Sequence, residues 1–244
     1  MKPVLLVIAH GSRDPRHAAT VHALVRRVRS LRPDVRVETG FLDFNLPSVQ
    51  GVLESLAAEG VRDVVALPLL LTRAFHAKAD IPAVLRDAPP QLRIRQAEVL
   101  GPSPLLLTAL ERRLYEAGLT PADKSSTGVV LASAGSTDPE AIAVIADIAR
   151  EWRHTGWCAV RPAFASAALP RTEDAVRELR ALGCSRVAVA PYVLAPGFLP
   201  DRIARGAADA DVLAEVLGPA PEVARVLLRR YEAARMPSLA AIGA

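Results

Sequence analysis

The chain has 244 residues, of which 51% are hydrophobic and 23% charged, a balance typical of a folded globular protein and unlike that of disordered or fibrous chains. Aromatic residues make up only 4%, and the net charge of +4 includes no long basic run, which together disfavour a nucleic-acid-binding protein. No stretch approaches the ~18 uninterrupted apolar residues of a membrane span, and the two cysteines lack metal-ligand spacing, so we expect a cytoplasmic protein without membrane or nucleic-acid partners.

Short apolar runs alternate with longer amphipathic segments along the first half of the chain. Asp14 followed by Pro15 would cap and begin a helix that runs through about Leu31. A second helix is expected to begin at Pro47 and to stop near Gly60. This alternation predicts an α/β fold with a parallel sheet. Its strands are expected at residues 4–9, 35–42, 64–71 and 94–100.

The same pattern recurs in the second half, because the chain contains an internal repeat. VLLVIAHGSRDP from Val4 aligns with GVVLASAGSTDP from Gly128. Three further matches follow in the same order: FLDFNLP with FASAALP, GVRDVVALPLLLTRAF with GCSRVAVAPYVLAPGF, and EVLGP with EVLGP. Four colinear matches indicate a duplicated domain, with residues 1–122 as the first copy and residues 123–244 as the second.

Polar side chains stand just past the predicted strands of the first copy. His10 follows the first strand, Asp43 the second, and His76 the loop after the third. Because the carboxyl ends of parallel strands meet at one edge of a sheet, two imidazoles and a carboxylate could face one crevice there. This donor set suits a divalent first-row metal ion. Solvated loop residues with no shared role are the alternative that spacing alone leaves open.

The repeat provides a comparison that favours the metal site. At the three aligned positions the second copy has Ala134, Ser166 and Leu199. It nevertheless keeps the surrounding turn and cap residues, so the fold itself does not require the two imidazoles and the carboxylate. Residues 1–122 also contain 16 Lys and Arg against 12 Asp and Glu, whereas residues 123–244 contain 14 of each. The positive charge of the first copy would attract a multiply anionic substrate.

In combination, these segments resemble the sirohydrochlorin chelatases. The resemblance rests on AHGSR at residues 9–13, GFLDF at 40–44, PLLLTRAFH at 68–76 and DIP at 80–82. The family consists of ATP-independent, class II chelatases that insert cobalt or ferrous iron into sirohydrochlorin for cobalamin or siroheme synthesis. The resemblance covers nearly the whole chain and implies the long form of the family: two tandem chelatase-like domains, each a small parallel sheet flanked by helices.

The resemblance also implies roles for individual residues. His10 would be a metal ligand and the proton acceptor, and His76 the opposing metal ligand. Asp43 would be the acidic metal ligand, although the family commonly has the longer glutamate at this position. The implied substrate-binding residues are Asn45, Leu71, Thr72, Arg73, Ala74 and Phe75. The first copy would therefore hold the metal and substrate site, and the second would be a degenerate repeat of the same fold.

The implied reaction needs no permanently bound cofactor and no nucleoside triphosphate, and the chain has no GxxxxGK[ST] motif. The metal is a substrate, Co²⁺ or Fe²⁺, and Ni²⁺ could use the same ligands. The second substrate would be sirohydrochlorin or a related polycarboxylate tetrapyrrole. Because two fused domains can form the cleft that a single-domain relative would build by pairing, we expect a monomer. The alternative function is a metal or tetrapyrrole carrier on the same fold, which delivers its ligand without catalysis.

Overall fold

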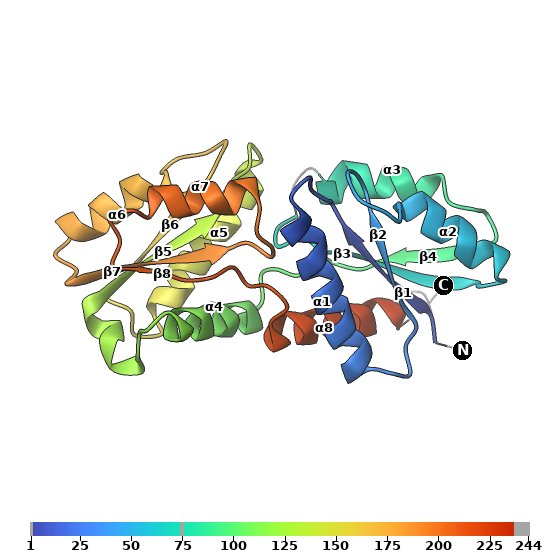
Figure 1. Ribbon diagram of the computed structural model, residues 1–244, viewed down its shortest axis with the longest axis horizontal. Helices are drawn as coiled ribbons and strands as arrows, with labels where there is room; N and C mark the ends of the chain where they lie inside the picture. Colours follow the sequence, from blue (N-terminus) through green and yellow to red (C-terminus); the bar gives the residue numbers. More distant parts are fainter. Residues whose placement is uncertain (1, 74–75, 237–244) are drawn as a thin grey trace, which may run out of the picture. The chain divides into compact units, whose positions relative to one another are not determined.

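The computed structural model describes residues 2–73 and 76–236, which form two compact units. Unit 1 contains residues 1–101 together with residues 223–244, and unit 2 contains residues 102–222. Each unit has one four-stranded parallel sheet with helices on both faces (Figure 1). The predicted α/β fold with two small parallel sheets is therefore confirmed.

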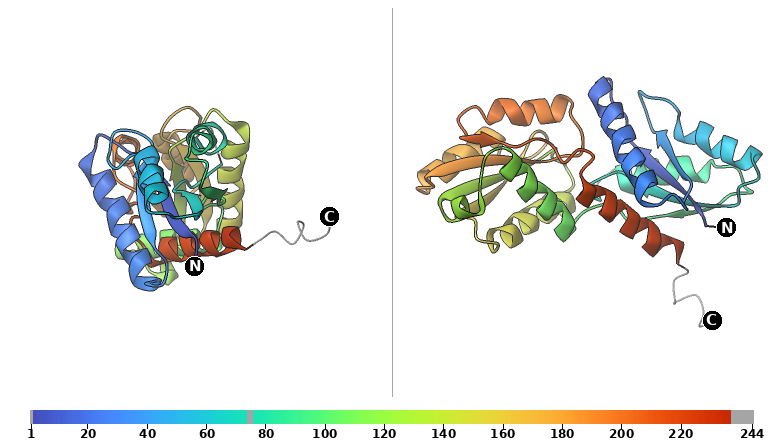
Figure 2. Two further views of the ribbon diagram at one scale, coloured as in Figure 1. Left: turned by 90° about the vertical axis from the view of Figure 1, so that its right-hand side faces the viewer. Right: turned by 60° about the horizontal axis from the view of Figure 1, so that its bottom comes forward.

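The sheet of unit 1 has the strand order β2-β1-β3-β4. Its strands are β1 (Val4–Ala9), β2 (Val37–Phe41), β3 (Asp63–Pro68) and β4 (Arg93–Gln96). One face is covered by α2 (Val49–Ala58) and α3 (Ile81–Arg86), and the other by α1 (Pro15–Leu31) and α8 (Pro221–Arg235) (Figure 1, Figure 2). A buried cluster that includes Leu6, Ile8 and Leu53 fills the space between the sheet and α2. All six residues of β1 are buried, as expected for a central strand covered on both faces.

Unit 2 repeats this topology with the strand order β6-β5-β7-β8. Its strands are β5 (Thr127–Ser133), β6 (Ala159–Phe164), β7 (Arg186–Tyr192) and β8 (Val212–Leu213). One face is covered by α6 (Thr172–Ala181) and α7 (Phe198–Gly206), and the other by α4 (Pro104–Glu116) and α5 (Pro139–Arg153) (Figure 1). A short 3₁₀ helix (Pro121–Ser126) leads into β5. The two sheets thus have the same order, as the internal repeat predicted.

Capping explains where the first helix of each unit begins. The Asp14 carboxylate accepts the backbone N–H of Arg16 at 2.9 Å, and Pro15 is the first helical residue, as predicted. In unit 2 the Asp138 carboxylate accepts the N–H of Glu140 at 3.0 Å in the same way. Both caps lie directly after the loop that follows the central strand, so they fix where that loop ends.

The second helix of unit 1 begins slightly later than the sequence predicted. α2 begins at Val49 and not at Pro47, because the Ser48 hydroxyl accepts the N–H of Gly51 at 3.1 Å and makes Ser48 the N-cap.

Among the helices in the described part of the chain, none is both long enough and apolar enough to cross a membrane.

Each unit takes one helix from the other sequence repeat. α4 belongs to residues 1–122 but packs against β7 in unit 2. α8 belongs to residues 123–244, but most of it lies in unit 1, where the hydroxyl of Tyr231 donates to the carbonyl of Pro3 at 2.7 Å. The compact units therefore differ from the two sequence repeats by the exchange of one helix each.

The contacts of Glu111 attach α4 to the second repeat. Its carboxylate oxygen Oε1 accepts hydrogen bonds from Lys124 Nζ at 2.6 Å and from the indole N–H groups of Trp152 and Trp157, each at 3.3 Å. The two indole rings meet edge to face, with centroids 6.0 Å apart. A charged acceptor on α4 thus satisfies three polar groups that lie in the second repeat.

Candidate functional site

The loops that follow β1 and β2 run side by side at the carboxyl edge of the unit 1 sheet. The N–H of Leu42 donates to the carbonyl of Ala9 at 3.0 Å, and the N–H of Asp43 donates to the carbonyl of His10 at 2.9 Å. Parallel pairing therefore continues past the ends of both strands. His10 is half-buried and Asp43 is exposed. The structure thus brings two of the three predicted metal-site residues together.

Gly11 allows the two loops to approach this closely. Its φ is +96°, and a Cβ at this position would lie 1.9 Å from the carbonyl oxygen of Asp43. Only glycine has both the conformational freedom and the space required here. A second contact joins the loops, since the N–H of Ser12 donates to the side-chain oxygen of Asn45 at 2.8 Å. The predicted substrate-binding Asn45 therefore also holds the loop pair in place.

An aromatic ring and a guanidinium group lie next to the His10 imidazole. Phe44 has φ +61° and remains 49% exposed, while its N–H donates to the Asp43 carboxylate at 2.8 Å. The ring centroids of Phe44 and His10 are 6.2 Å apart. The guanidinium carbon of Arg13 lies 5.2 Å from the centroid of the Phe44 ring, within the range of a cation–π contact. The sequence pattern did not predict a role for Phe44, although the repeat aligns it with an alanine.

Unit 2 has the same loop pair without the candidate ligands. Gly135 has φ +94°, and a Cβ there would lie 1.9 Å from the carbonyl oxygen of Ser166. The N–H of Ser166 donates to the carbonyl of Ala134 at 3.0 Å, and Ala167 has φ +61°, as its counterpart in unit 1 does. Each loop also contains a cis Leu–Pro peptide bond. The backbone of this loop pair therefore forms without an imidazole, a carboxylate or an aromatic ring.

The predicted substrate-binding stretch after β3 falls only partly within the described residues. Leu71 is buried, Thr72 is half-buried and Arg73 is exposed. Ala74 and Phe75 lie outside the described residues. Among the three described positions, only Arg73 thus has a largely exposed side chain, so Leu71 would offer mainly its backbone to a ligand.

His76 begins a single π-helical turn that leads directly into α3. Such turns occur frequently at functional sites. The role of its imidazole as the opposing metal ligand stays a prediction. Among the side chains that the structure describes, which do not include that of His76, no group of three or more His, Cys, Asp and Glu residues is arranged to hold a metal ion.

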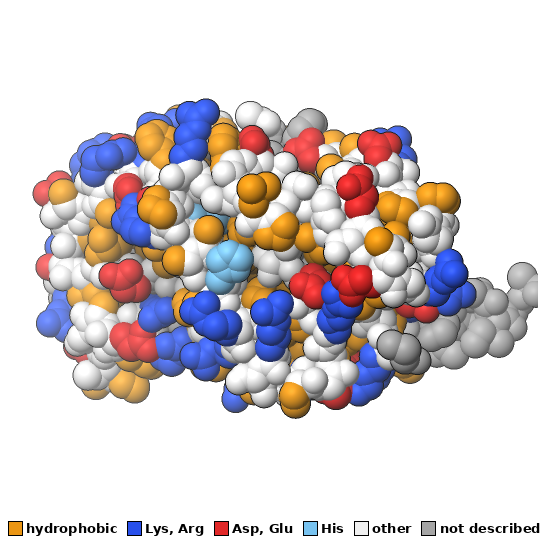
Figure 3. All heavy atoms as spheres, turned by 45° about the vertical axis from the view of Figure 1, so that its right-hand side comes forward, with side chains coloured by type: hydrophobic (Ala, Val, Ile, Leu, Met, Phe, Trp, Pro, Cys, Tyr) orange, Lys and Arg blue, Asp and Glu red, His pale blue; other side chains and the backbone are white. Residues whose placement is uncertain are grey.

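Two further histidines lie on α1 and differ in their surroundings. Burial, and then the neighbouring His10, lowers the pKa of His17, and within the part of the chain described its buried Nδ1 has no hydrogen-bond partner. The His22 ring packs edge-on against Phe41, with centroids 5.7 Å apart, which is a packing role. Histidine side chains reach the molecular surface, where hydrophobic side chains lie next to them (Figure 3).

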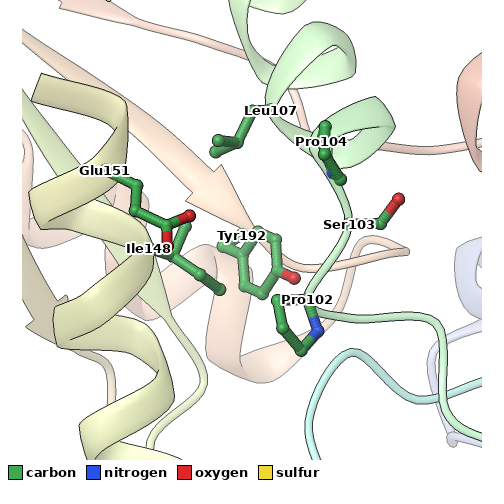
Figure 4. Close-up of a pocket in the computed structure, with 7 residues that line it drawn as sticks. All are labelled: Pro102, Ser103, Pro104, Leu107, Ile148, Glu151 and Tyr192. Atoms are coloured by element: carbon green, nitrogen blue, oxygen red, sulfur yellow. The ribbon is translucent and has the colours of Figure 1, made fainter. Parts of the chain in front are cut away.

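A small cavity of about 190 Å³ lies in unit 2. It is lined by Pro102, Ser103, Pro104, Leu107, Ile148, Glu151 and Tyr192 (Figure 4). None of the predicted site residues lines it, and its volume is below the ~300 Å³ at which pockets for organic ligands usually begin. This cavity is therefore too small for a tetrapyrrole.

Comparisons with known proteins agree with the repeat and with the fold. The model of the CbiX family matches residues 4–117 and again residues 128–234. A sirohydrochlorin cobaltochelatase of Priestia megaterium is 32% identical over 210 residues, which cover 83% of this chain and 67% of that protein. A sirohydrochlorin ferrochelatase of Bacillus subtilis is 28% identical over 211 residues, which cover 84% of this chain and 79% of that protein. The structure of SirB from Bacillus subtilis with Fe³⁺ is similar with a TM-score of 0.83, at 25% identity and 96% coverage of both chains.

Proposed function

Since the chain belongs to the CbiX family, we propose that it is a chelatase, a lyase that inserts Co²⁺ or Fe²⁺ into sirohydrochlorin in cobalamin or siroheme biosynthesis. The relatives named as sirohydrochlorin cobaltochelatase and ferrochelatase align with more than four-fifths of the chain, which supports this activity.

The observation that carries the proposed site is the contrast between the two loop pairs. Both have a glycine at the point of closest approach and both have a residue at φ +61°, yet only unit 1 has His10 and Asp43 on this backbone. Side chains that the backbone does not need are candidates for chemistry. We therefore assign the metal and substrate site to unit 1 and regard unit 2 as its degenerate repeat.

In this site His10 and His76 would hold the incoming ion, with Asp43 as the acidic third ligand. Metal insertion requires the ion to lose water and two pyrrole nitrogens of the macrocycle to lose their protons. Neutral imidazoles bind divalent first-row ions without the softness of thiolates, so the ion can still leave for the macrocycle. His10 would also accept a proton from a pyrrole N–H. Ni²⁺ could use the same three ligands.

The tetrapyrrole would lie against the loops at the carboxyl edge of unit 1. The amide nitrogen of Asn45 would face the ligand, because its oxygen already accepts the N–H of Ser12. Leu71 and Thr72 would contribute mainly backbone, together with Ala74 and Phe75. Arg73 is exposed, and its guanidinium lies 4.0 Å from the carboxylate of Glu98. An exposed ion pair at this distance is weak, so a substrate carboxylate could replace Glu98.

Turnover with and without His10 tests the proposal. Purified protein at catalytic concentration is mixed with excess sirohydrochlorin and Co²⁺, and the absorption change is followed beyond one equivalent. His10→Ala should lose at least ~90% of the enzymatic rate with little change in melting temperature, because Ala134 occupies the same loop position in unit 2. His154→Ala, a change of the same chemistry in unit 2, is the matched control. Product that stops at one equivalent would indicate a carrier, and a wild-type rate in His10→Ala would remove the proposed ligand.

The same variant tests the number of sites. Titration with Co²⁺ should reveal one site per chain of this type, lost in His10→Ala and in His76→Ala. Two equivalent sites, or one that survives either substitution, would contradict the assignment of all ligands to unit 1.

We further propose that the protein acts in the cytoplasm as a monomer, with no permanently bound cofactor and with neither nucleic acid nor membrane as a partner. The tetrapyrrole and the metal ion are its substrates. Light scattering on the purified chain should give the mass of a single 26.0 kDa chain. A stable dimer at micromolar concentration would contradict this.

A further inference from the structure

The side chains of Phe44 and Arg13 form an unusual pair beside His10. Phe44 leaves 49% of its surface exposed, and it lies at φ +61°, a region that non-glycine residues rarely adopt. The guanidinium of Arg13 covers one face of the ring at 5.2 Å. Since half of the residue is still exposed, Phe44 remains accessible to a ligand.

The fold does not require either side chain. In unit 2 the position of Phe44 is occupied by Ala167 at the same φ of +61°, and the position of Arg13 by Thr137. An exposed phenylalanine also gains little from burial, because much of its apolar surface still meets water. The ring and the cation are therefore confined to the unit that carries the histidine, without a structural reason for either.

Hydrogen bonds hold the two groups in a fixed relation to each other. The N–H of Phe44 donates to the Asp43 carboxylate at 2.8 Å, which fixes the backbone that carries the ring. The N–H of Ser12, the residue before Arg13, donates to the side chain of Asn45 at 2.8 Å. The first bond fixes the backbone within one loop and the second joins that loop to the other, so a ligand that used both groups would lose little conformational entropy.

We propose that Phe44 and Arg13 are substrate-positioning residues: the ring packs against the face of a flat, conjugated macrocycle, and the guanidinium pairs with one of its peripheral carboxylates. The proposal rests on the proposed function for the identity of the macrocycle. Offset packing of aromatic surfaces and bidentate pairing of guanidinium with carboxylate are the interactions that these two groups make best. Together they would set the macrocycle at a fixed height and rotation beside the His10 imidazole.

Equilibrium binding of metal-free sirohydrochlorin, followed by fluorescence quenching of the tetrapyrrole, tests the pair directly. Phe44→Ala should raise Kd and KM by about five- to tenfold, and Arg13→Thr by a similar factor, with kcat changed less than about twofold. Phe44→Tyr should keep wild-type affinity, since it keeps the ring. Phe44→Leu, which keeps apolar bulk without an aromatic face, should bind as weakly as Phe44→Ala. Leu31→Ala is the matched control, because Leu31 is 48% exposed at the opposite end of α1.

The outcomes separate this inference from the proposed function. If wild-type protein binds the tetrapyrrole and both Phe44→Leu and Arg13→Thr bind equally well, the positioning role is wrong and the chelatase assignment stands. A fall in kcat at unchanged KM in either variant would also overturn the positioning role. Failure of the wild-type chain to bind any metal-free tetrapyrrole would overturn the proposed function instead.

A second, independent observation concerns the two cysteines, both in unit 2. Cys158 immediately precedes β6 and Cys184 shortly precedes β7, the two strands that flank β5. Their sulfur atoms are 3.6 Å apart. Gly128 of β5 makes this possible, because a Cβ there would lie 2.8 Å from the sulfur of Cys184. The two thiols therefore meet across the central strand, over a position without a side chain.

The two thiols differ in their access to solvent. Cys158 is exposed, whereas Cys184 is buried with 5% of its surface accessible. Burial, followed by the hydrogen bond to Cys158, raises the pKa of Cys184 to about 11. A soluble oxidant would thus react at Cys158, and Cys184 would meet only the product of that reaction.

We infer that Cys158 and Cys184 form a peroxide-reactive pair that closes to an intramolecular disulfide. The Cys158 thiolate attacks one oxygen of hydrogen peroxide, forming an S–OH bond and releasing hydroxide. The sulfur of Cys184 then attacks the Cys158 sulfur, an S–S bond forms, and hydroxide leaves with the Cys184 proton as water. In sum, two thiols and one peroxide give one disulfide and two water molecules.

Peroxide titration with thiol counting and mass spectrometry of unreduced peptides tests this. One equivalent of hydrogen peroxide should remove both free thiols, link the two peptides within one chain, and raise the melting temperature by about 5–10 °C. Cys184→Ala should leave Cys158 to oxidise to sulfinic acid without any rise. Cross-linked dimers, or wild-type protein in which Cys158 becomes sulfinic acid while the Cys184 thiol survives, would overturn the inference.

Discussion

Replacing Gly11 by alanine tests whether the close approach of the two unit 1 loops builds the site. The new Cβ would lie 1.9 Å from the carbonyl oxygen of Asp43 and 3.0 Å from its carbonyl carbon. Since non-bonded heavy atoms rest at about 3.5 Å or more, one loop must move by roughly 1 Å or more. That movement would separate the hydrogen-bonded pair formed by the Asp43 N–H and the His10 carbonyl.

Two contributions make up the loss in free energy of unfolding that Gly11→Ala should cause. An alanine at φ +96° costs about 1–2 kcal/mol in backbone conformation. Loss of the hydrogen bonds from Asp43 to His10 and from Ser12 to Asn45 adds about 1–2 kcal/mol. Together the two contributions come to about 2–4 kcal/mol. For a chain of this size each kcal/mol shifts the melting temperature by about 2–4 °C, so Gly11→Ala should melt roughly 4–16 °C below wild type.

Two other glycines provide matched controls. Gly60 has φ +79° and nothing within 4 Å of an added Cβ, so Gly60→Ala should show only the backbone cost, a loss of about 2–8 °C. Gly135 has the same 1.9 Å clash in unit 2, so Gly135→Ala should melt like Gly11→Ala. Only Gly11→Ala should lose metal insertion, by at least about tenfold at a temperature where both variants remain folded, because it displaces His10 and Asp43.

Thermal melting and initial insertion rates of the three variants test whether the close approach at Gly11 builds the site. Equal melting temperatures for Gly11→Ala and Gly60→Ala would show that the clash is relieved without cost, and the reasoning from the close approach would fail. Equal losses of insertion in Gly11→Ala and Gly135→Ala would refute the placement of the site in unit 1.

Three further substitutions test the packing and its pH dependence. Glu111→Ala should cost about 2–3 kcal/mol in thermal or urea unfolding, because Lys124 and two indole N–H groups lose their acceptor; a change below about 0.5 kcal/mol would show that this cluster does not hold α4. Tyr231→Ala, at a fully buried position of α8, should cost about 3–5 kcal/mol and speed amide exchange in β1 but not in β5; unchanged exchange in β1 would contradict the helix exchange. The side-chain hydrogen bond from Arg180 holds the pKa of Asp211 below its ordinary value, so its stabilisation is present above about pH 4 and is lost as the pH falls through the folded-state pKa. Asp211→Asn should therefore destabilise by about 1 kcal/mol at pH 7, a figure discounted for solvent exposure, and a melting difference that persisted at pH 2 would argue against this origin.

The sequence predicted the sheets well because buried parallel strands are continuous apolar runs, but it misplaced the end of β3. The prediction extended this strand to residue 71, whereas β3 ends at Pro68. Leu69 donates its N–H to the Ile8 carbonyl at 2.7 Å, and the chain then leaves the sheet. Leu69 and Leu71 are buried all the same, so apolar periodicity could not distinguish the strand from the loop that follows it.

The exchange of α4 and α8 could not be predicted from the sequence for a related reason. Both helices bury an apolar face with spacings of three and four residues. On α4 the buried residues include Leu106, Leu110 and Leu114, and on α8 they include Val223, Leu227 and Tyr231. Either face would fit a sheet of this type, since such a pattern specifies burial without specifying the partner. Tertiary contacts, among them those of Glu111 and Tyr231, identify which sheet each helix covers.

The neighbourhood of His10 and Asp43 followed from topology, because residues just past adjacent parallel strands must lie at one edge. The position of Phe44 beside His10 could not be predicted in this way, because the sequence does not show that a phenylalanine adopts a positive φ. The repeat contained the signal that could have revealed it, since phenylalanine aligns with Ala167 on an otherwise matching loop. The side chain of His76 lies outside the described part of the structure, so its role as the opposing ligand remains a prediction.

Comparison of the two loop pairs distinguishes the residues that this edge of the sheet needs to fold from those that we propose act in the reaction. Glycine at the close approach and an aspartate cap on the next helix are present in both units, so they belong to the scaffold. At these loop positions the imidazole, the carboxylate and the exposed ring occur only in unit 1. The loop pair of unit 2 has the same backbone without them. Because these groups add little to stability, they can be substituted singly without the loop collapsing. A loss of insertion after such a substitution therefore reports on chemistry or binding and not on folding, which is what makes unit 2 a built-in control for unit 1.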